Sequence, residues 1–160
     1  MNSVVGAIKD FFEKGDMQYK YNEEKQLFRS GVDMQSALGN IDLIISVKEN
    51  SYVVYAVMNS KAEKNLYNQV AEFLHRANYG MLNGNFEFDY SDGEIRYKTY
   101  VNCDGIHPSS NVVADSILLP IIIFERYGKH LLNVMLGNGS PEEEIEKAEQ
   151  ILDFISSDER

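Results

Sequence analysis

A β-hairpin signature in residues 78–101 constrains the fold more than any other part of the chain. The stretch reads NYGMLNGNFEFDYSDGEIRYKTYV, in which two runs of alternating apolar and polar residues flank an Asp-Gly pair. Asp-Gly suits a tight two-residue turn of type I′, so we place the loop at Asp92 and Gly93. The cross-strand pairs predicted from this loop are Tyr90 with Ile95, Phe88 with Tyr97, and Phe86 with Thr99.

This register gives the hairpin two unlike faces. One face is apolar and aromatic, and the other sets Asp89 opposite Arg96 and Glu87 opposite Lys98. Side chains alternate between the two faces of a strand, so a slip of one residue would mix the faces. The register is therefore well specified.

Residues 41–58 predict a second hairpin, which turns at Glu49-Asn50. Its predicted core pairs are Val47 with Tyr52, Ile45 with Val54, Leu43 with Ala56, and Ile41 with Met58. The reverse face is also apolar, too much so for a fully solvated sheet. We therefore expect another element of the chain, or a second molecule, to cover the reverse-face residues Ile44, Val53, Tyr55 and Val57.

The remaining segments complete an α+β domain over residues 1–160. Modest strands are predicted at residues 17–21 and 26–33, together with an antiparallel sheet flanked by N-terminal, central and C-terminal helices. Pro120 lies inside the long C-terminal apolar helix and is expected to kink it or split it in two. The helices are predicted over residues 4–12, 62–79, 111–135 and 140–155.

The charge of the chain argues against two classes of partner. The 160 residues carry a net charge of −10, and Lys and Arg are scattered beside acids. No basic stripe is present to contact a phosphate backbone or an anionic membrane, so we expect neither nucleic acid nor membrane binding. A single cysteine, Cys103, and the lack of a visible targeting segment predict a cytoplasmic protein.

The central third of the chain resembles the YbjN family of bacterial proteins. The resemblance rests on FLHRANYG at residues 73–80, NFEFD at 85–89 and GEIRYK at 93–98. It implies a type III secretion chaperone-like fold, frequent homodimerisation and a role in sensory transduction or regulation. It supplies no catalytic residues, and partner binding by related chaperone-like proteins is a fold-level analogy.

One cluster invites a catalytic interpretation. Cys103 and His107 are four residues apart, and a thiol near a histidine can act as an activated nucleophile. However, the intervening Asp-Gly pair and the following His-Pro are typical of a turn that leads into a helix. His75, His107 and His130 lack the close spacing of common zinc ligands, so we expect no metal and no cofactor.

Two functional hypotheses follow. The first is a non-enzymatic protein-binding module, chaperone-like or regulatory, that acts as a homodimer and binds a protein or peptide through its sheet face or edge. The alternative is a small-molecule-binding protein or small enzyme with a pocket near Cys103 and His107.

A tyrosine suits an interface when its ring packs on apolar surface and its hydroxyl remains in water. Tyr52, Tyr55, Tyr97 and Tyr100 are candidates for this role. The predicted interaction residues are Ile44, Val53, Tyr55, Val57 and Tyr100.

Overall fold

The computed structural model describes the backbone of residues 3–157 and the side chains of residues 4–150. Within this part of the chain, six strands form one antiparallel sheet, and four helices pack around it. The strands are β1 (Lys20–Asn22), β2 (Leu27–Asp33), β3 (Asn40–Val47), β4 (Ser51–Met58), β5 (Asn85–Phe88) and β6 (Ile95–Asn102). The helices are α1 (Ser3–Lys14), α2 (Tyr67–Asn78), α3 (Ser110–Met135) and α4 (Pro141–Ser157), with a 3₁₀ turn η1 (Lys64–Leu66) before α2.

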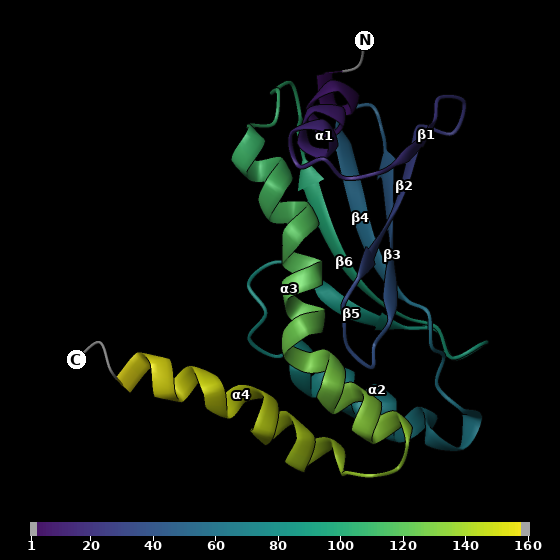
Figure 1. Cartoon of the computed structure of the whole chain (residues 1–160), viewed down its shortest axis with the longest axis vertical. Coiled ribbons are helices and arrows are strands. Elements are labelled where there is room, and N and C mark those ends of the chain that lie inside the picture. The colour runs from purple at the N-terminus through teal and green to yellow at the C-terminus, as the bar shows by residue number, and fades with distance from the viewer. Residues whose placement is uncertain (1–2, 158–160) are drawn as a thin grey trace.

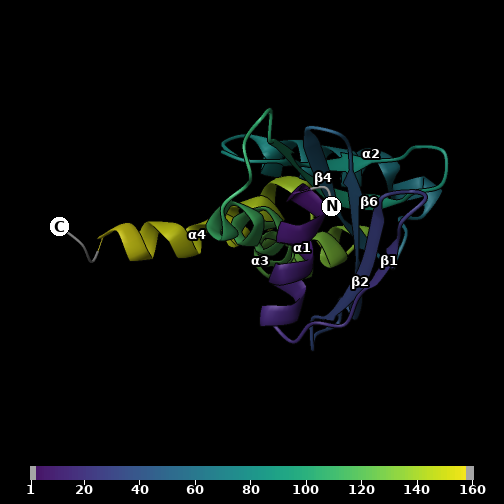
Figure 2. The same cartoon turned by 90° about the horizontal axis from the view of Figure 1, so that it is seen from above.

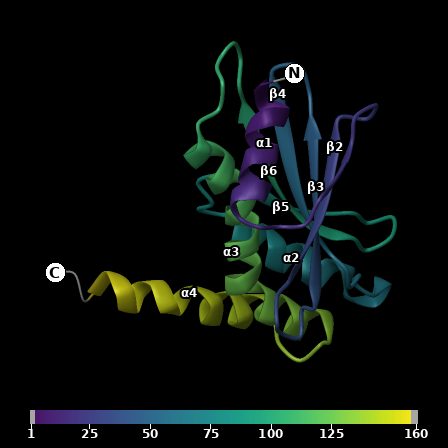
Figure 3. The ribbon, with the colours of Figure 1, turned by 45° about the horizontal axis from the view of Figure 1, so that its top comes forward.

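The sheet has two very different faces. Its strand order is β1-β2-β3-β4-β6-β5, so the two hairpins adjoin through β4 and β6. Helices α1 and α3 lie against the face that we call the inner face, and α4 runs outward from the end of α3 (Figure 1). Figures 2 and 3 show no described helix over the opposite, outer face. The α+β prediction, with helices at the start, centre and end of the chain, is confirmed.

The β3–β4 hairpin has the predicted register. Val47 pairs with Tyr52 and Ile41 pairs with Met58, as the turn at Glu49-Asn50 requires. Every inner-face residue of these two strands is buried, whereas the alternate residues are half-buried or exposed. The period of two in the sequence therefore separates an inner face from an outer one.

The predicted register of the β5–β6 hairpin was wrong by two residues. Phe86 pairs with Tyr97, and Glu87 pairs with Arg96. Because a shift of two keeps every side chain on its face, the division into an aromatic and a charged face is preserved. Asp89 does not pair with Arg96; its backbone N–H donates to Glu94 O in the loop.

Local polar contacts explain why Asp92-Gly93 is not a two-residue turn. Side-chain oxygens of Asp89 and Asp92 accept the N–H groups two residues ahead, which builds a longer loop. Gly93 has φ +79°, and a Cβ there would lie 2.4 Å from Ala62 O. The Ala62 N–H donates to Gly93 O at 3.0 Å, so a contact with a residue distant in sequence stabilises the longer loop.

The other elements follow their sequence signals closely. The helix predicted over residues 62–79 consists of η1 and α2, and the helix predicted over 111–135 is the single helix α3. Pro120 therefore does not split α3. The first strand begins at Lys20 rather than at residue 17, and the last part of the apolar stripe in α4, residues 151–155, lies outside the described side chains.

A buried polar contact joins the sheet to α3 where Pro120 interrupts the helix. Proline has no N–H, so the carbonyl of Ser116, four residues earlier, lacks its helical donor. The hydroxyl of Thr99 on β6 donates to that carbonyl at 2.7 Å. The Ser116 hydroxyl lies 2.8 Å from the buried hydroxyl of Tyr52 on β4. The carbonyl left free by Pro120 thus becomes an anchor for the sheet.

We predict that Thr99→Val lowers the free energy of unfolding by about 1–2 kcal/mol, because a buried carbonyl loses its donor. In a Pro120→Ala background the new alanine N–H can donate a hydrogen bond to Ser116 O. Thr99→Val should therefore lower the free energy of unfolding by less in that background. Denaturant unfolding of the four proteins measures this coupling. Equal costs in both backgrounds would contradict the assignment of Thr99 as the substitute donor.

A second buried polar cluster fastens α4 to α3. The side chain of Glu144 is 1% exposed, and a Cβ on Gly139 would lie 2.6 Å from its Oε1. Burial acts to raise the pKa of this carboxylate, but hydrogen bonds from three neighbours outweigh burial and lower the pKa to about 2. Those neighbours are Lys147 Nζ at 2.8 Å, Asn133 Nδ2 at 3.1 Å and His130 Nδ1 at 2.8 Å.

The lowered pKa of Glu144 makes the stability of the protein depend on pH in acid. The carboxylate stabilises the fold above its ordinary pKa of 4.5, and this contribution is lost as the pH falls from there towards 2. We expect a loss of roughly 2–3 kcal/mol across this window. In unfolding measurements between pH 4.5 and pH 2, Glu144→Gln should lack this loss of unfolding free energy. Glu143→Gln, a change at an exposed neighbour, should keep it.

Candidate interaction face

The structure brings the five predicted interaction residues together on the outer face of the sheet. Ile44 on β3 lies directly opposite Tyr55 on β4, and Val53 lies directly opposite Tyr100 on β6. Val57 follows Tyr55 on the same side of β4. Tyr100 is 55% exposed and the other four are half-buried, so the face presents a continuous apolar strip that no described helix covers.

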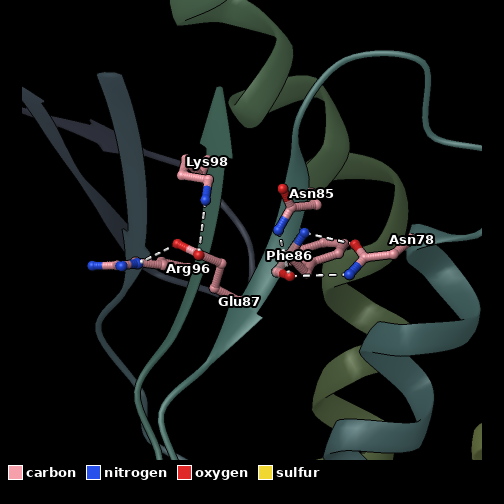
Figure 4. A network of polar contacts seen from close by, with 6 residues as sticks. All are labelled: Asn78, Asn85, Phe86, Glu87, Arg96 and Lys98. Carbon is pink, nitrogen blue, oxygen red and sulfur yellow. Dashed lines mark hydrogen bonds and ion pairs between the residues drawn. The ribbon is translucent and has the colours of Figure 1, made fainter. Parts of the chain in front are cut away.

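A network of charged side chains borders this strip. The guanidinium of Arg96 lies 4.2 Å from the ring centroid of Tyr55, a cation–π contact. Glu87 accepts from Arg96 at 2.9 Å and from Lys98 at 3.0 Å (Figure 4). Burial acts to raise the pKa of Glu87, but the two cations outweigh it and lower the pKa. Figure 4 shows Glu87 between the two cations. The contact with Glu87 thus restrains the same Arg96 side chain that stacks on Tyr55.

Sequence reasoning missed two further residues of the face. Arg29 on β2 lies directly opposite Ile44, and Leu27 lies opposite Ser46. These side chains extend the apolar strip and add a cation at its other end. Alternation within residues 26–33 could have placed Leu27 and Arg29 on one side of a strand, but the pairing of β2 with β3 was not predicted.

Two of the four tyrosines considered for an interface belong to the core instead. Tyr52 and Tyr97 are fully buried on the inner face. The Tyr52 hydroxyl contacts Ser116, and Tyr97 donates to Asn83 O at 2.6 Å, so neither hydroxyl needs water. Burial raises the pKa of both hydroxyls to about 12. Only Tyr55 and Tyr100 of this group lie on the outer face.

A side chain occupies part of the β5 edge of the sheet. The side chain of Asn78, at the end of α2, accepts from Phe86 N at 2.6 Å and donates to Phe86 O at 3.0 Å. Figure 4 shows this amide lying against β5 in the position that a neighbouring strand would take. The amide thus satisfies backbone groups that an edge strand otherwise offers to a partner. This contact favours the sheet face over the β5 edge as the place where a partner binds.

The alternative site at Cys103 and His107 has the geometry of a turn. Cys103 donates its backbone N–H to Asn50 O at 2.7 Å, and Gly105 has φ +69°. The cysteine is 6% exposed, and burial raises the pKa of its thiol, which disfavours the reactive thiolate. His107 is exposed, and no hydrogen bond between it and Cys103 is present among the described residues.

No group of three or more metal-ligating side chains comes together within the described residues. His75 is exposed on α2, His107 lies in the loop before α3, and His130 contacts Glu144 between α3 and α4. Likewise, none of the described helices is both long enough and apolar enough to cross a bilayer.

We predict that Cys103 in the native protein reacts with a thiol reagent at least roughly tenfold more slowly than an exposed thiol, because the thiol is buried and its pKa is raised. A Cys103→Ala/Ser60→Cys variant, which moves the thiol to an exposed position, provides the reference rate. Reaction as fast as the reference would contradict burial and restore the catalytic hypothesis.

Comparisons with known proteins identify the fold. No family model matches the chain, and no curated protein matches it. Among solved structures, the chain is similar to the crystal structure of YbjN from E. coli, described as a candidate transcription regulator. The TM-score is 0.60 at 13% sequence identity, and the match covers 79% of this chain and 92% of that chain. The protein has a YbjN-like fold. At this identity the similarity establishes the fold alone.

Proposed function

We propose that this protein is a non-enzymatic binding module of the bacterial cytoplasm that takes a protein or peptide partner on the outer face of its sheet. The observation that carries the proposal is the meeting of Ile44, Val53, Tyr55, Val57 and Tyr100 on one face that no described helix covers. A sheet face that meets only water is usually polar throughout, whereas this one carries an apolar strip between charged residues.

The composition of the face supports a protein partner. Interface cores are enriched in tyrosine and arginine, and here Arg96 stacks on Tyr55 beside aliphatic neighbours. The Glu87 contact holds Arg96 in place before binding, which reduces the conformational entropy lost on association.

The fold is compatible with a regulatory role exerted through protein contacts. The neighbour YbjN is described as a candidate transcription regulator. In this chain the net charge of −10 opposes direct contact with DNA, so we place the regulatory step in binding another protein. The proposal includes a chaperone-like mode of action. It also includes homodimer formation, which sedimentation velocity would measure directly.

We expect Tyr55→Asp and Ile44→Asp to abolish capture of a protein partner from a lysate of the source cell, because a carboxylate would be placed in the apolar strip. Leu82→Asp is the matched control, since Leu82 is fully exposed in the loop before β5. Mass spectrometry identifies the captured proteins, and near-ultraviolet circular dichroism confirms folding.

If Ile44→Asp or Tyr55→Asp unfolds the protein, Tyr100→Asp tests the same face at an exposed position. A partner that binds the parent and the Leu82 control but not a folded face variant supports the proposal. A partner set that is unchanged in all folded face variants would contradict it.

A further inference from the structure

Two cations on the outer face lie directly opposite each other without a carboxylate partner. Lys20 on β1 pairs with Arg29 on β2, and both point away from the helices. Like charges directly opposite on an antiparallel pair are destabilising. Within the described residues no ion pair joins either cation to an acid, including Glu23 and Glu24 in the adjoining turn. Neither cation is therefore neutralised by an ion pair within the described residues.

The same two cations line adjacent hollows in the surface. One hollow has a volume of about 330 Å³ and is also lined by Lys25 and Leu27, which adds a third cation and an apolar wall. The other, of about 400 Å³, is also lined by Tyr19. Room beside unpaired cations is what an anionic side chain of a partner requires.

The opposite end of the apolar strip carries charges of both signs. Arg96 and Lys98 share the carboxylate of Glu87, and Asp89 and Glu94 line the same hollow as Arg96. On the paired strands of this face the basic residues outnumber the acidic ones by one. The basic residues are Lys20, Arg29, Arg96 and Lys98, and the acidic residues are Asp33, Asp42 and Glu87. The whole chain has a net charge of −10, so the paired strands of the outer face are less acidic than the rest of the molecule.

We infer that the partner of the outer face is an acidic polypeptide segment with apolar side chains between its carboxylates. This inference rests on the proposed function and names the chemical class of the partner. Along one row of the sheet, Arg29, Ile44, Tyr55 and Lys98 succeed one another on neighbouring strands. Three strand spacings separate the two cations, so matching carboxylates lie roughly 15 Å apart. That distance corresponds to about ten residues of helix or four to five residues of extended chain.

Two other occupants fit the charges less well. A second copy stacked face to face would bring its own Arg29 and Lys98 towards the same cations, which costs free energy through like-charge repulsion. A nucleic acid presents an unbroken row of phosphates, which the −10 charge of the chain opposes. An acidic segment can place its carboxylates beside Lys20 and Arg29 and its apolar side chains on the apolar strip.

Selection from a phage-displayed library of random dodecapeptides tests the inference. The protein is offered as the parent, as Tyr55→Asp, as Lys20→Glu/Arg29→Glu, and as the control Lys14→Glu/Lys129→Glu. Lys14 and Lys129 are exposed on α1 and α3, so the control has the same net charge as the face variant. Reversing both cations also keeps their mutual repulsion, so folding should be unaffected by the exchange.

We expect the parent and the control to enrich peptides that combine Asp or Glu with apolar residues, and the face variant to lose them. A synthetic copy of an enriched peptide should bind Lys20→Glu/Arg29→Glu at least about tenfold more weakly than the control, and more weakly in high salt. The same peptide with each acid replaced by lysine should not bind the parent.

Three results would overturn the inference, and they separate it from the proposed function. Peptides that depend on Tyr55 but show no acidic preference would leave the binding face intact and refute the partner class. An absence of any peptide that depends on Tyr55 would refute both. Binding of a short mixed-sequence DNA duplex that is lost in Lys20→Glu/Arg29→Glu would assign the cations to nucleic acid instead.

Discussion

The packing of α3 against the inner face of the sheet is the constraint on which the rest of the structure depends. The helix is 26 residues long and contains Pro120, which removes one backbone donor inside the core. A buried carbonyl without a donor is costly, and Thr99 on β6 supplies the missing one to Ser116. Thr99 thus joins β6 to α3 at the carbonyl that Pro120 leaves without a donor, and Tyr52 adds a second contact at the same residue.

Because α1 and α3 lie against the inner face and no described helix covers the outer one, the apolar side chains of the outer face are shielded from water in another way. Ile44, Val53, Tyr55 and Val57 are half-buried, and Arg96 lies over the ring of Tyr55. Surface of this kind keeps the protein folded without a partner and still offers apolar area to one. The Asn78 amide satisfies the backbone groups of Phe86 on the β5 edge, which favours the face as the binding region of that half of the sheet.

The two hairpins differ in how well local sequence patterns predicted their strand register. The β3–β4 register could be read from the sequence, since a two-residue turn joins matched alternating runs. The β5–β6 register could not, because Asp89 and Asp92 form side-chain contacts in the loop and Gly93 contacts Ala62, which is distant in sequence. Only the assignment of side chains to faces survived, because alternation depends on burial and not on loop length.

The sequence by itself determined the α+β class, the strand alternation, the ends of most helices and the apolar character of the outer face. The tertiary structure alone decided that β4 lies between β3 and β6, and that α1 and α3 lie against the same face of the sheet. It also decided that Arg29, Tyr55 and Lys98 share one row. The physical reason is that alternation is a local property of each strand. The order of strands, in contrast, depends on hydrogen bonds and burial between segments that α2 and its loops separate in the chain.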